Sequence, residues 1–419
     1  MINKTALFCH LLQGFVEKNQ FIITGDDPRN FFNIRVSEKL SMKEKTVLLV
    51  SGLELENKTS FTRQLSLLNS AFGGTGIRAL LTGPISSDER APGASVLKDN
   101  FGRSYQDISF LIRETGARAA VLLGYPDQFP FVNDISNSAS DNATDGCGCP
   151  DIPFFLWAQF SRPPDEGSLG CLIPVPLTEI TRSFIISSGY KNPGPVIPHG
   201  VDTSSYYPLN ETECKREKYR LGLKDRFVIG SVGANTSRKR FKNIIESFAC
   251  FYKHRPDGFL LIKTDRVVSL DGTDMREHAR KHGVLEAVKF ITDDLSESRM
   301  RALYGVMDLY LNLSEWEGFC IPVIEAMACG VPVATQPIQG PAEIMPYPDL
   351  IIPESSIHKE EGRVFLHANP AAVAGFMSGV SINTALLKKL GAEGRRAAVN
   401  KYDIRVAAGL WEKLFNQYP

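Results

Sequence analysis

The amino-acid sequence predicts an α/β protein with two doubly wound domains, each built on a parallel sheet that helices cover on both faces. Short, continuously apolar segments recur along the chain and alternate with segments of helical periodicity. Strands that are apolar on both faces and alternate with helices are typical of buried parallel sheets. A chain of 419 residues is also long enough for two domains of ordinary size, each with its own core. We therefore expect two such domains, which meet near Val196–Leu209.

Nine apolar segments are predicted as strands. Those in the first half of the chain are Thr46–Val50, Ala79–Thr82, Ala119–Leu123 and Phe154–Trp157. Those in the second half are Phe227–Val232, Phe259–Ile262, Val288–Ile291, Asp308–Leu313 and Val331–Ala334. Helices are predicted at Phe61–Phe72 and Phe241–His254. Because the second of these has a single apolar stripe, we expect the stripe to pack in the core; its residues are Ile244, Ile245, Phe248 and Phe251.

The order of these elements predicts the domain boundaries. Residues 1–44 match no pattern and form an N-terminal extension, 45–200 and 201–400 form the two domains, and 401–419 form a terminal helix. The segment 133–151 has no Lys or Arg and is rich in Asp, Asn, Ser and Gly, which predicts a long exposed loop. Its Cys147 and Cys149 are compatible with zinc, but no second pair or His lies nearby, so an ordinary loop is the simpler interpretation.

The composition is that of an ordinary soluble protein. The chain is 43% hydrophobic and 22% charged, with a formal net charge of zero, so nothing global indicates a nucleic-acid or anionic-membrane partner. No segment approaches the roughly 18 apolar residues that span a bilayer, and the N-terminus has no convincing signal-peptide pattern. A cytoplasmic location is therefore expected, although peripheral contact with a membrane is compatible with these features.

Two carboxylates surround a turn that opens a predicted helix in the segment Ser314–Glu343. Glu317 and Glu325 are eight residues apart, after a predicted strand, and Ile321–Cys329 follows the turn with helical spacing. Free backbone N–H groups from Gly318 to Cys320, at a helix N-terminus, form a site for an anion. A phosphate beside carboxylates is expected only for a ligand that also offers hydroxyl groups, as a sugar nucleotide does. The alternative is an ordinary strand–helix turn with surface glutamates.

A second candidate anion site follows the predicted strand Phe227–Val232. The segment Gly233–Arg240 (GANTSRKR) places Arg238, Lys239 and Arg240 directly before a helix. Cations at this point would stabilise the negative charge that grows when a sugar–phosphate bond breaks. Arg can bind phosphate oxygens bidentately, whereas Lys acts as a point charge. The alternative interpretation is a solvated basic surface.

The segment Ser314–Glu343 resembles the E-x7-E signature of glycosyltransferase family 4, the retaining glycosyltransferases of the GT-B fold. The resemblance extends from about Val196 to the C-terminus. It implies two Rossmann-like domains that face each other across a cleft, the first binding the acceptor and the second the nucleotide sugar, with the terminal helix packed back on the first domain.

The resemblance also implies an activity. A hexosyl group would move from a UDP- or GDP-linked sugar to an acceptor hydroxyl by a front-face reaction, in which the leaving phosphate accepts the acceptor's proton. No cofactor and no metal are implied. The D-x-D triplet with which the other large glycosyltransferase fold holds a metal does not occur in the chain.

Roles for single residues follow from the same resemblance. Lys239 and Arg238 would hold the donor diphosphate, and Glu317 would lie beside the donor sugar and its reacting carbon, so these three are the predicted catalytic residues. Glu325 would accept hydrogen bonds from the ribose. The other predicted donor-binding residues lie in the two loops and are Gly318, Phe319, Cys320, Gly233 and Asn235.

The chain departs from the family pattern in several places. Cys320 replaces a second glycine, and Ala234 stands where many relatives have Arg. No Gly-Gly pair follows the first predicted strand, where the chain has Ser51-Gly52, and no His follows the strand at Phe154–Trp157. Gln159 could supply a hydrogen bond at that second position, and His199 is a further candidate for an acceptor or sugar contact, with a structural role as its alternative.

Other functions remain open at this point. A sugar-nucleotide-binding subunit without activity is compatible with the altered loops of the first half. A sugar-nucleotide epimerase of the same fold is a second alternative, although histidines are few in the first half. A phosphorylase would be longer and carry pyridoxal phosphate on a Lys. A dehydrogenase is disfavoured because neither Gly52 nor Gly233 begins a G-x-G-x-x-G segment.

Overall fold

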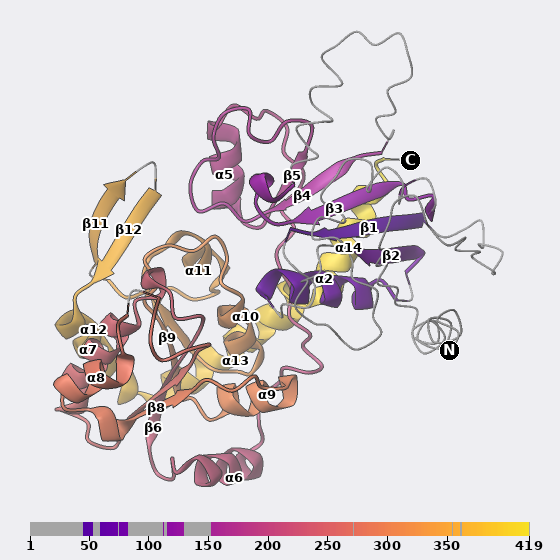
Figure 1. Cartoon of the computed structure of the whole chain (residues 1–419). Helices are drawn as coiled ribbons and strands as arrows, with labels where there is room; N and C mark the ends of the chain where they lie inside the picture. The colour runs from indigo at the N-terminus through magenta and orange to yellow at the C-terminus, as the bar shows by residue number, and fades with distance from the viewer. Residues whose placement is uncertain are drawn as a thin grey trace, which may run out of the picture.

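The computed structural model describes residues 45–52, 59–73, 75–82, 112, 115–129, 152–270, 272–353, 355–360 and 363–418 (Figure 1). The predicted extension 1–44 and the predicted loop 133–151, with Cys147 and Cys149, lie outside these residues. The described residues form two five-stranded sheets and one two-stranded sheet. All pairs in both large sheets are parallel. The predicted α/β class with two parallel-sheet domains is therefore confirmed, and we call the parts that hold these sheets the first and the second domain.

The sheet of the first domain has the strand order β2-β1-β3-β4-β5. Its strands are β1 (Lys45–Ser51), β2 (Ile77–Thr82), β3 (Ala119–Leu123), β4 (Phe154–Ala158) and β5 (Ile173–Pro176). Along β1, Val47 and Leu49 enter one hydrophobic core and Leu48 and Val50 another, so both faces of the sheet are buried. The sequence did not predict β5, because two of its four residues are proline; proline is tolerated there because β5 is an edge strand.

The sheet of the second domain has the order β10-β9-β6-β7-β8. Its strands are β6 (Phe227–Val232), β7 (Gly258–Lys263), β8 (Val288–Ile291), β9 (Leu309–Asn312) and β10 (Val333–Thr335), each within two residues of its predicted bounds. An antiparallel hairpin of β11 (Ser355–Glu360) and β12 (Arg363–Ala368) was not predicted, and it projects from this domain in Figure 1.

Helices flank both sheets. In chain order they are α2 (Ser60–Ala71), α5 (Glu179–Ser187), α6 (Glu211–Leu221), α7 (Phe241–Tyr252), α8 (Met275–Lys281), α9 (Glu297–Gly305), α10 (Ile321–Ala328), α11 (Gln339–Ile344), α12 (Pro370–Ser381), α13 (Thr384–Lys401) and α14 (Ile404–Phe415). Short 3-10 turns lie at Pro126–Gln128, Ser237–Lys239 and Leu285–Ala287. The apolar stripe of α7 is buried, as its spacing predicts.

The last helix, α14, returns to the first domain, as Figure 1 shows by its yellow ribbon beside β1 and α2. Trp411 makes edge contacts with Phe155 and Trp157 of β4, at 5.9 Å and 5.7 Å between ring centroids. At the start of α14 the chain crosses the linker between the domains, where Gly200 packs so tightly that an added Cβ would lie 2.5 Å from the Cα of Ile404. The linker that joins the two domains at Gly200 is therefore also packed against the start of α14.

Among the described residues, no single helix is long and apolar enough to cross a membrane. The bent pair α12 and α13, which meet at 96°, passes the same test of length and composition only when taken together.

Candidate active site

Two loops of the second domain bring the predicted cations and Glu317 together. The strands β6 and β9 are parallel neighbours, so the loops that follow them leave the same edge of the sheet. Arg238 Nη1 lies 2.6 Å from Glu317 Oε1, and Lys239 Nζ contacts the same oxygen. The backbone joins the two loops as well, because Glu315 N–H donates to Arg238 O at 2.8 Å. The structure thus places all three predicted catalytic residues in one cluster.

The charges of this cluster do not cancel. Burial alone would raise the pKa of Glu317, but Lys239 and Arg238 outweigh burial and hold the pKa of its carboxyl below the ordinary value. Glu317 therefore remains ionised at neutral pH, and with two cations the three side chains carry a net charge of +1. A buried net charge without a counterion is unfavourable, so the cluster favours an additional anion as its partner.

Neighbouring residues fix the turn that carries Glu317. Ser314 Oγ lies 2.7 Å from Asn312 Oδ1 and 3.2 Å from Glu317 Oε1, and these two acceptors share its single proton. Asn312 in turn donates through Nδ2 to Thr335 Oγ1 at 3.1 Å, which ties the turn to β10. Arg238 also lies over the ring of Trp316, 5.0 Å from its centroid. These contacts restrict the carboxylate and the guanidinium to the positions described.

We call Gly233–Arg240 the basic loop. Its two predicted donor-binding residues, Gly233 and Asn235, fix the conformation of the loop. An added Cβ at Gly233 would lie 3.1 Å from Cε of Lys239, so glycine leaves room for the lysine side chain. Asn235 is bound within its own domain, because its N–H donates to Asp265 Oδ1 at 2.7 Å and its Nδ2 donates to Val267 O at 3.2 Å. In this conformation Gly233 and Asn235 hold the backbone of the basic loop in place.

The N-terminus of α10 presents unpaired backbone donors. The N–H groups of Gly318, Phe319 and Cys320 donate no hydrogen bond to any residue within the described ranges. Cys320 is the N-cap residue, with φ at 80°, in the left-handed region that favours glycine. A glycine at this position would adopt the same backbone conformation without strain. It also leaves three N–H groups at a helix start, an arrangement that suits an anion.

Glu325 lies at the contact between the two domains. Its Oε2 accepts from the Tyr304 hydroxyl at 2.7 Å, and its Oε1 lies 3.1 Å from Arg63 Nη1 of α2 in the first domain. Arg63 also reaches Glu297 Oε1 at 3.2 Å. Burial raises the pKa of Glu325 above its ordinary value, although Arg63 and the Tyr304 hydroxyl lower the pKa in part. Both carboxylate oxygens of Glu325, the residue predicted to bind the ribose, thus already have partners within the protein.

Tyr310 of β9 is buried beside the loop that follows β6. Its hydroxyl donates to Val232 O, at the end of β6, at 3.2 Å. Burial raises the pKa of Tyr310, and Cys320, Glu317 and Glu325 raise it further.

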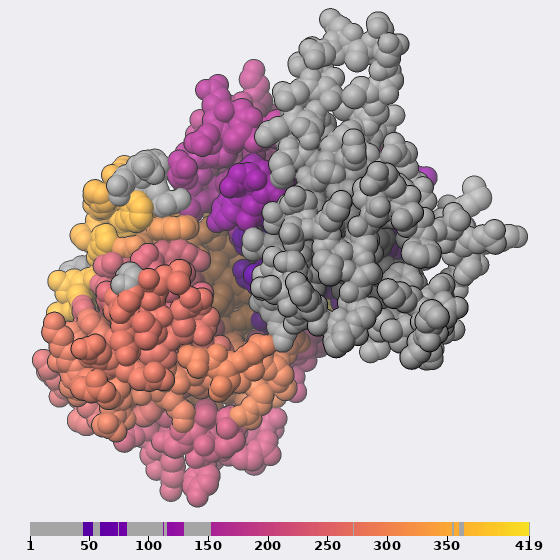
Figure 2. Space-filling model, viewed as in Figure 1, coloured from indigo at the N-terminus to yellow at the C-terminus, as the bar shows by residue number. Residues whose placement is uncertain are grey.

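The first domain lies directly against this site. An added Cβ at Gly318 would lie 2.5 Å from the carbonyl oxygen of Gln159, so Gly318 is the residue that allows the domains to approach. Described atoms of the two domains also lie side by side in Figure 2, indigo to magenta against orange. Glu343 of α11 strengthens the contact, because its carboxylate accepts from the N–H groups of Glu179 and Ile180 at the start of α5, at 2.7 Å and 3.0 Å.

His199 is a buried core side chain in this structure. It is 1% exposed and lies between the rings of Trp157 and Phe319, at 4.6 Å and 5.4 Å between centroids. Neither ring nitrogen has a hydrogen-bond partner among the described residues, and burial lowers the pKa of His199 to about 3. The ring is therefore neutral at ordinary pH. Of the two interpretations of His199, this packing favours the structural one.

Three contributors to the site were not predicted from the sequence. Arg63 lies more than 250 positions before Glu325, and Tyr304 is on α9, which is not among the helices predicted from the sequence. Glu343 is the last residue of the segment Ser314–Glu343, but nothing in the sequence around it indicates a contact with the first domain. An aligned set of related sequences would be the means to find such long-range pairs, because they leave no local pattern.

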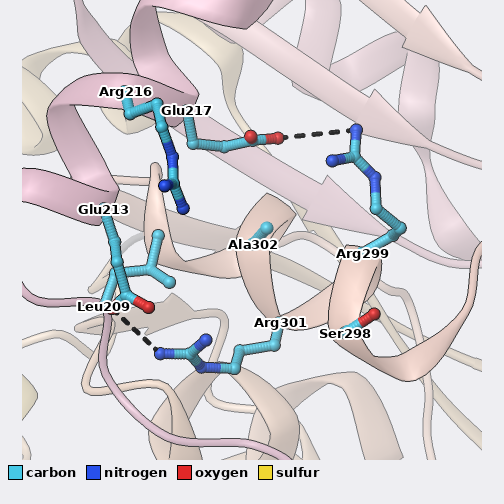
Figure 3. A pocket seen from close by; sticks show the side chains of 8 residues that line it. All are labelled: Leu209, Glu213, Arg216, Glu217, Ser298, Arg299, Arg301 and Ala302. Atoms are coloured by element: carbon cyan, nitrogen blue, oxygen red, sulfur yellow. Dashed lines mark hydrogen bonds and ion pairs between the residues drawn. The ribbon is translucent and has the colours of Figure 1, made fainter.

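A separate pocket of about 220 Å³ lies between α6 and α9 (Figure 3). Its arginines face glutamates: Arg301 Nη2 lies 3.2 Å from Glu213 Oε2, and Arg299 Nη2 lies 3.7 Å from Glu217 Oε1. None of its lining residues belongs to the cluster around Glu317 or to the partners of Glu325. The pocket is therefore a groove of surface ion pairs apart from the candidate active site.

Comparison with known proteins places this geometry in context. Residues 214–356 match the family described as glycosyl transferases group 1. The lipopolysaccharide core biosynthesis mannosyltransferase LpsB of Rhizobium meliloti (strain 1021) is 27% identical over 158 residues, 36% of this chain and 43% of that protein. The capsular polysaccharide biosynthesis glycosyltransferase CapM of Staphylococcus aureus is 26% identical over 250 residues, 58% of this chain and 60% of that protein. The chain thus spans about half the length of these curated relatives.

Solved structures share the architecture over a larger part of the chain. Sucrose-phosphate synthase from Thermosynechococcus elongatus superposes with a TM-score of 0.68 at 14% identity, covering 89% of this chain and 99% of that chain. Anabaena HepE, solved in complex with UDP and glucose, gives a TM-score of 0.65 at 14% identity, covering 89% of this chain and 100% of that chain. At these identities the likeness concerns the fold. We conclude that the chain has the GT-B fold, and that residues 214–356 of its second domain match the group 1 glycosyl transferases.

Proposed function

We propose that the protein is a retaining glycosyltransferase of family 4 that moves a hexosyl group from a nucleotide-diphosphate sugar to an acceptor hydroxyl. The observation that carries this proposal is the cluster of Arg238 and Lys239 on Glu317, beside the unpaired N–H groups of α10. A net charge of +1 and free backbone donors suit a diphosphate, and a carboxylate among them suits the hydroxyl groups of a sugar.

In the proposed reaction the bond between the sugar's anomeric carbon and the diphosphate oxygen breaks, and the acceptor oxygen forms its bond on the same face. The acceptor's proton passes to the departing phosphate oxygen, so no protein base is required. Lys239 and Arg238 stabilise the negative charge that develops on the diphosphate. Because the reaction requires no protein base, it is compatible with Gln159 at the position where the family pattern has a His.

Glu325 is proposed to bind the ribose of the donor. Arg63 and Tyr304 now satisfy its carboxylate, so the ribose hydroxyls must share it with them or replace Arg63 at Oε1. Because Arg63 belongs to the first domain, donor binding and the contact between the domains then depend on the same carboxylate. Occupation of this site by nucleotide would accordingly change how tightly the domains are held together.

The donor is proposed to carry UDP or GDP. UDP is present in the solved complexes of Anabaena HepE and Staphylococcus aureus TarM. A relative from Mycolicibacterium smegmatis, 29% identical over 146 residues, is a GDP-mannose-dependent mannosyltransferase. No cofactor is proposed, and the acceptor is left as a hydroxyl-bearing molecule bound by the first domain.

Acceptor-dependent release of nucleoside diphosphate tests this proposal. The purified chain is incubated with each UDP- and GDP-sugar, with and without a panel of hydroxyl acceptors, in buffer that contains EDTA. We expect release above the acceptor-free background with one donor, and an α-linked product when an α-linked donor is used. A donor that binds without release under all conditions would favour the second candidate, a sugar-nucleotide-binding subunit. Activity only after Mg²⁺ or Mn²⁺ is restored would contradict the metal-independent reaction.

A further inference from the structure

We propose that α7 and α8 hold a divalent transition-metal ion, of the zinc class, between Glu246, His278 and His282. Glu246 is on α7, His278 is on α8, and His282 is the residue that ends α8. The two histidines are four positions apart, so successive turns of the helix place them on one side. The three side chains are half-buried or exposed, within the described part of the chain, and belong to no contact of the candidate active site.

The distances between the three ligand atoms suit a small metal ion. Glu246 Oε1 lies 3.0 Å from His278 Nε2 and 4.0 Å from His282 Nε2, and all three ligand atoms lie within 4.8 Å of one another. Two ligands bonded to zinc at about 2.1 Å in tetrahedral geometry are roughly 3.4 Å apart. Only small rotations of the side chains are therefore needed to place all three around one ion.

The chemistry of the donor set also selects the class of metal. Imidazole nitrogen with one carboxylate suits zinc, copper or nickel, whereas magnesium and calcium prefer oxygen ligands. A neutral imidazole offers one ring nitrogen with a free lone pair, which is the form that binds a metal. Three protein ligands leave a fourth position for water.

A simple ion pair between His278 and Glu246 accounts for part of this geometry, but it has no need of His282. The rings of His278 and His282 nevertheless lie 4.7 Å apart, with both Nε2 atoms turned toward the same carboxylate oxygen. When each ring carries its proton on Nδ1, the two Nε2 lone pairs and the carboxylate oxygen are free to bind one cation between them. This convergence is the observation on which the proposal rests.

The bound ion would join two helices next to the basic loop. Helix α7 begins at Phe241, directly after the turn with Arg238 and Lys239. The segment before α8 supplies Asp265 and Val267, which bind Asn235 of the same loop. An ion between α7 and α8 therefore fastens the support of that loop, and it takes no part in the transfer. Its effect is on stability.

Zinc binding to the full chain tests the inference without reference to any transferase activity. The protein is stripped with EDTA, desalted and titrated with ZnCl2, and the zinc retained after a second desalting is measured by elemental analysis. We expect one equivalent of zinc and a higher melting temperature, and no such response to MgCl2. His278→Gln and His282→Gln should each abolish the zinc-dependent rise in melting temperature, with His282→Gln the less disturbing because its ring is the more exposed.

His254→Gln is the matched control, because His254 is exposed near the end of α7 and lies outside the three-residue set. It should bind zinc as the unaltered chain does. Absence of zinc binding to the unaltered chain would overturn the inference. Binding that survives unchanged in both His278→Gln and His282→Gln would overturn it as well, and would direct attention to other ligands such as Cys147 and Cys149.

Discussion

Replacement of Lys239 with alanine is expected to lower turnover of the proposed transfer by roughly two to three powers of ten. Lys239 and Arg238 share one oxygen of Glu317, so removal of Lys239 leaves the cluster electrically neutral and takes away a charge that would face the departing diphosphate. That charge matters most when the bond breaks, because the negative charge on the diphosphate is then greatest. The dissociation constant of the donor should therefore rise much less than turnover falls, as steady-state kinetics together with donor titration would show.

Lys242→Ala is the matched control for this experiment. It removes the same charge three residues further on, from an exposed position on α7. Its turnover should equal that of the unaltered chain. If Lys239→Ala weakens donor binding and lowers turnover to the same extent, Lys239 contributes ordinary ground-state binding, and the proposed stabilisation of the leaving group is wrong.

Replacement of Glu325 with alanine is expected to weaken nucleotide binding by roughly ten- to a hundredfold. A hydrogen bond to a charged group is worth about 1.5–3 kcal/mol, and about 1.4 kcal/mol corresponds to a factor of ten in affinity. The variant also leaves Arg63 without its buried partner, so melting temperature must be measured beside affinity. Isothermal titration with UDP and GDP gives the affinity directly.

Glu297→Ala separates these two effects. Glu297 is the other acidic partner of Arg63, at 3.2 Å, but it is 45% exposed and has no proposed contact with ribose. Its loss should leave nucleotide affinity unchanged. Equal affinity in Glu325→Ala and the unaltered chain would remove the ribose role of Glu325, and an equal loss in Glu297→Ala would assign the effect to the position of Arg63.

The fold was predictable because its signals are local. Buried parallel strands are continuously apolar, and all nine predicted strands are present within two residues of their expected bounds. β5 was not predicted because its prolines suppress the strand signal. The β11–β12 hairpin was not predicted because β11 is mostly polar, and its one apolar residue, Ile357, is 66% exposed. A continuous apolar pattern therefore predicts buried parallel strands, and it misses strands that are rich in proline or polar residues.

The candidate site was predictable only where its residues stand in loops directly after strands. Glu317 and the two cations stand in loops after strands, and parallel strands end at one edge of a sheet, so their meeting follows from topology. The contact of Arg63 with Glu325 joins the two domains across most of the chain, and nothing near either residue indicates it. The left-handed backbone of Cys320 gives no signal in the cysteine itself, and only the glycine of the family pattern at that position indicates it.

Binding of nucleotide to the purified chain tests the central claim most directly. Melting temperature is measured with UDP, GDP and their sugar derivatives, and affinity is then determined by titration for any that respond. At one hundred times its dissociation constant, a ligand that binds only the folded chain adds about 2.7 kcal/mol to the free energy of unfolding. We predict a clear rise in melting temperature with one of the two nucleoside diphosphates, and a much smaller rise in Glu325→Ala at the same ligand concentration. A chain that responds to none of them would contradict a donor site built from Lys239, Glu317 and Glu325.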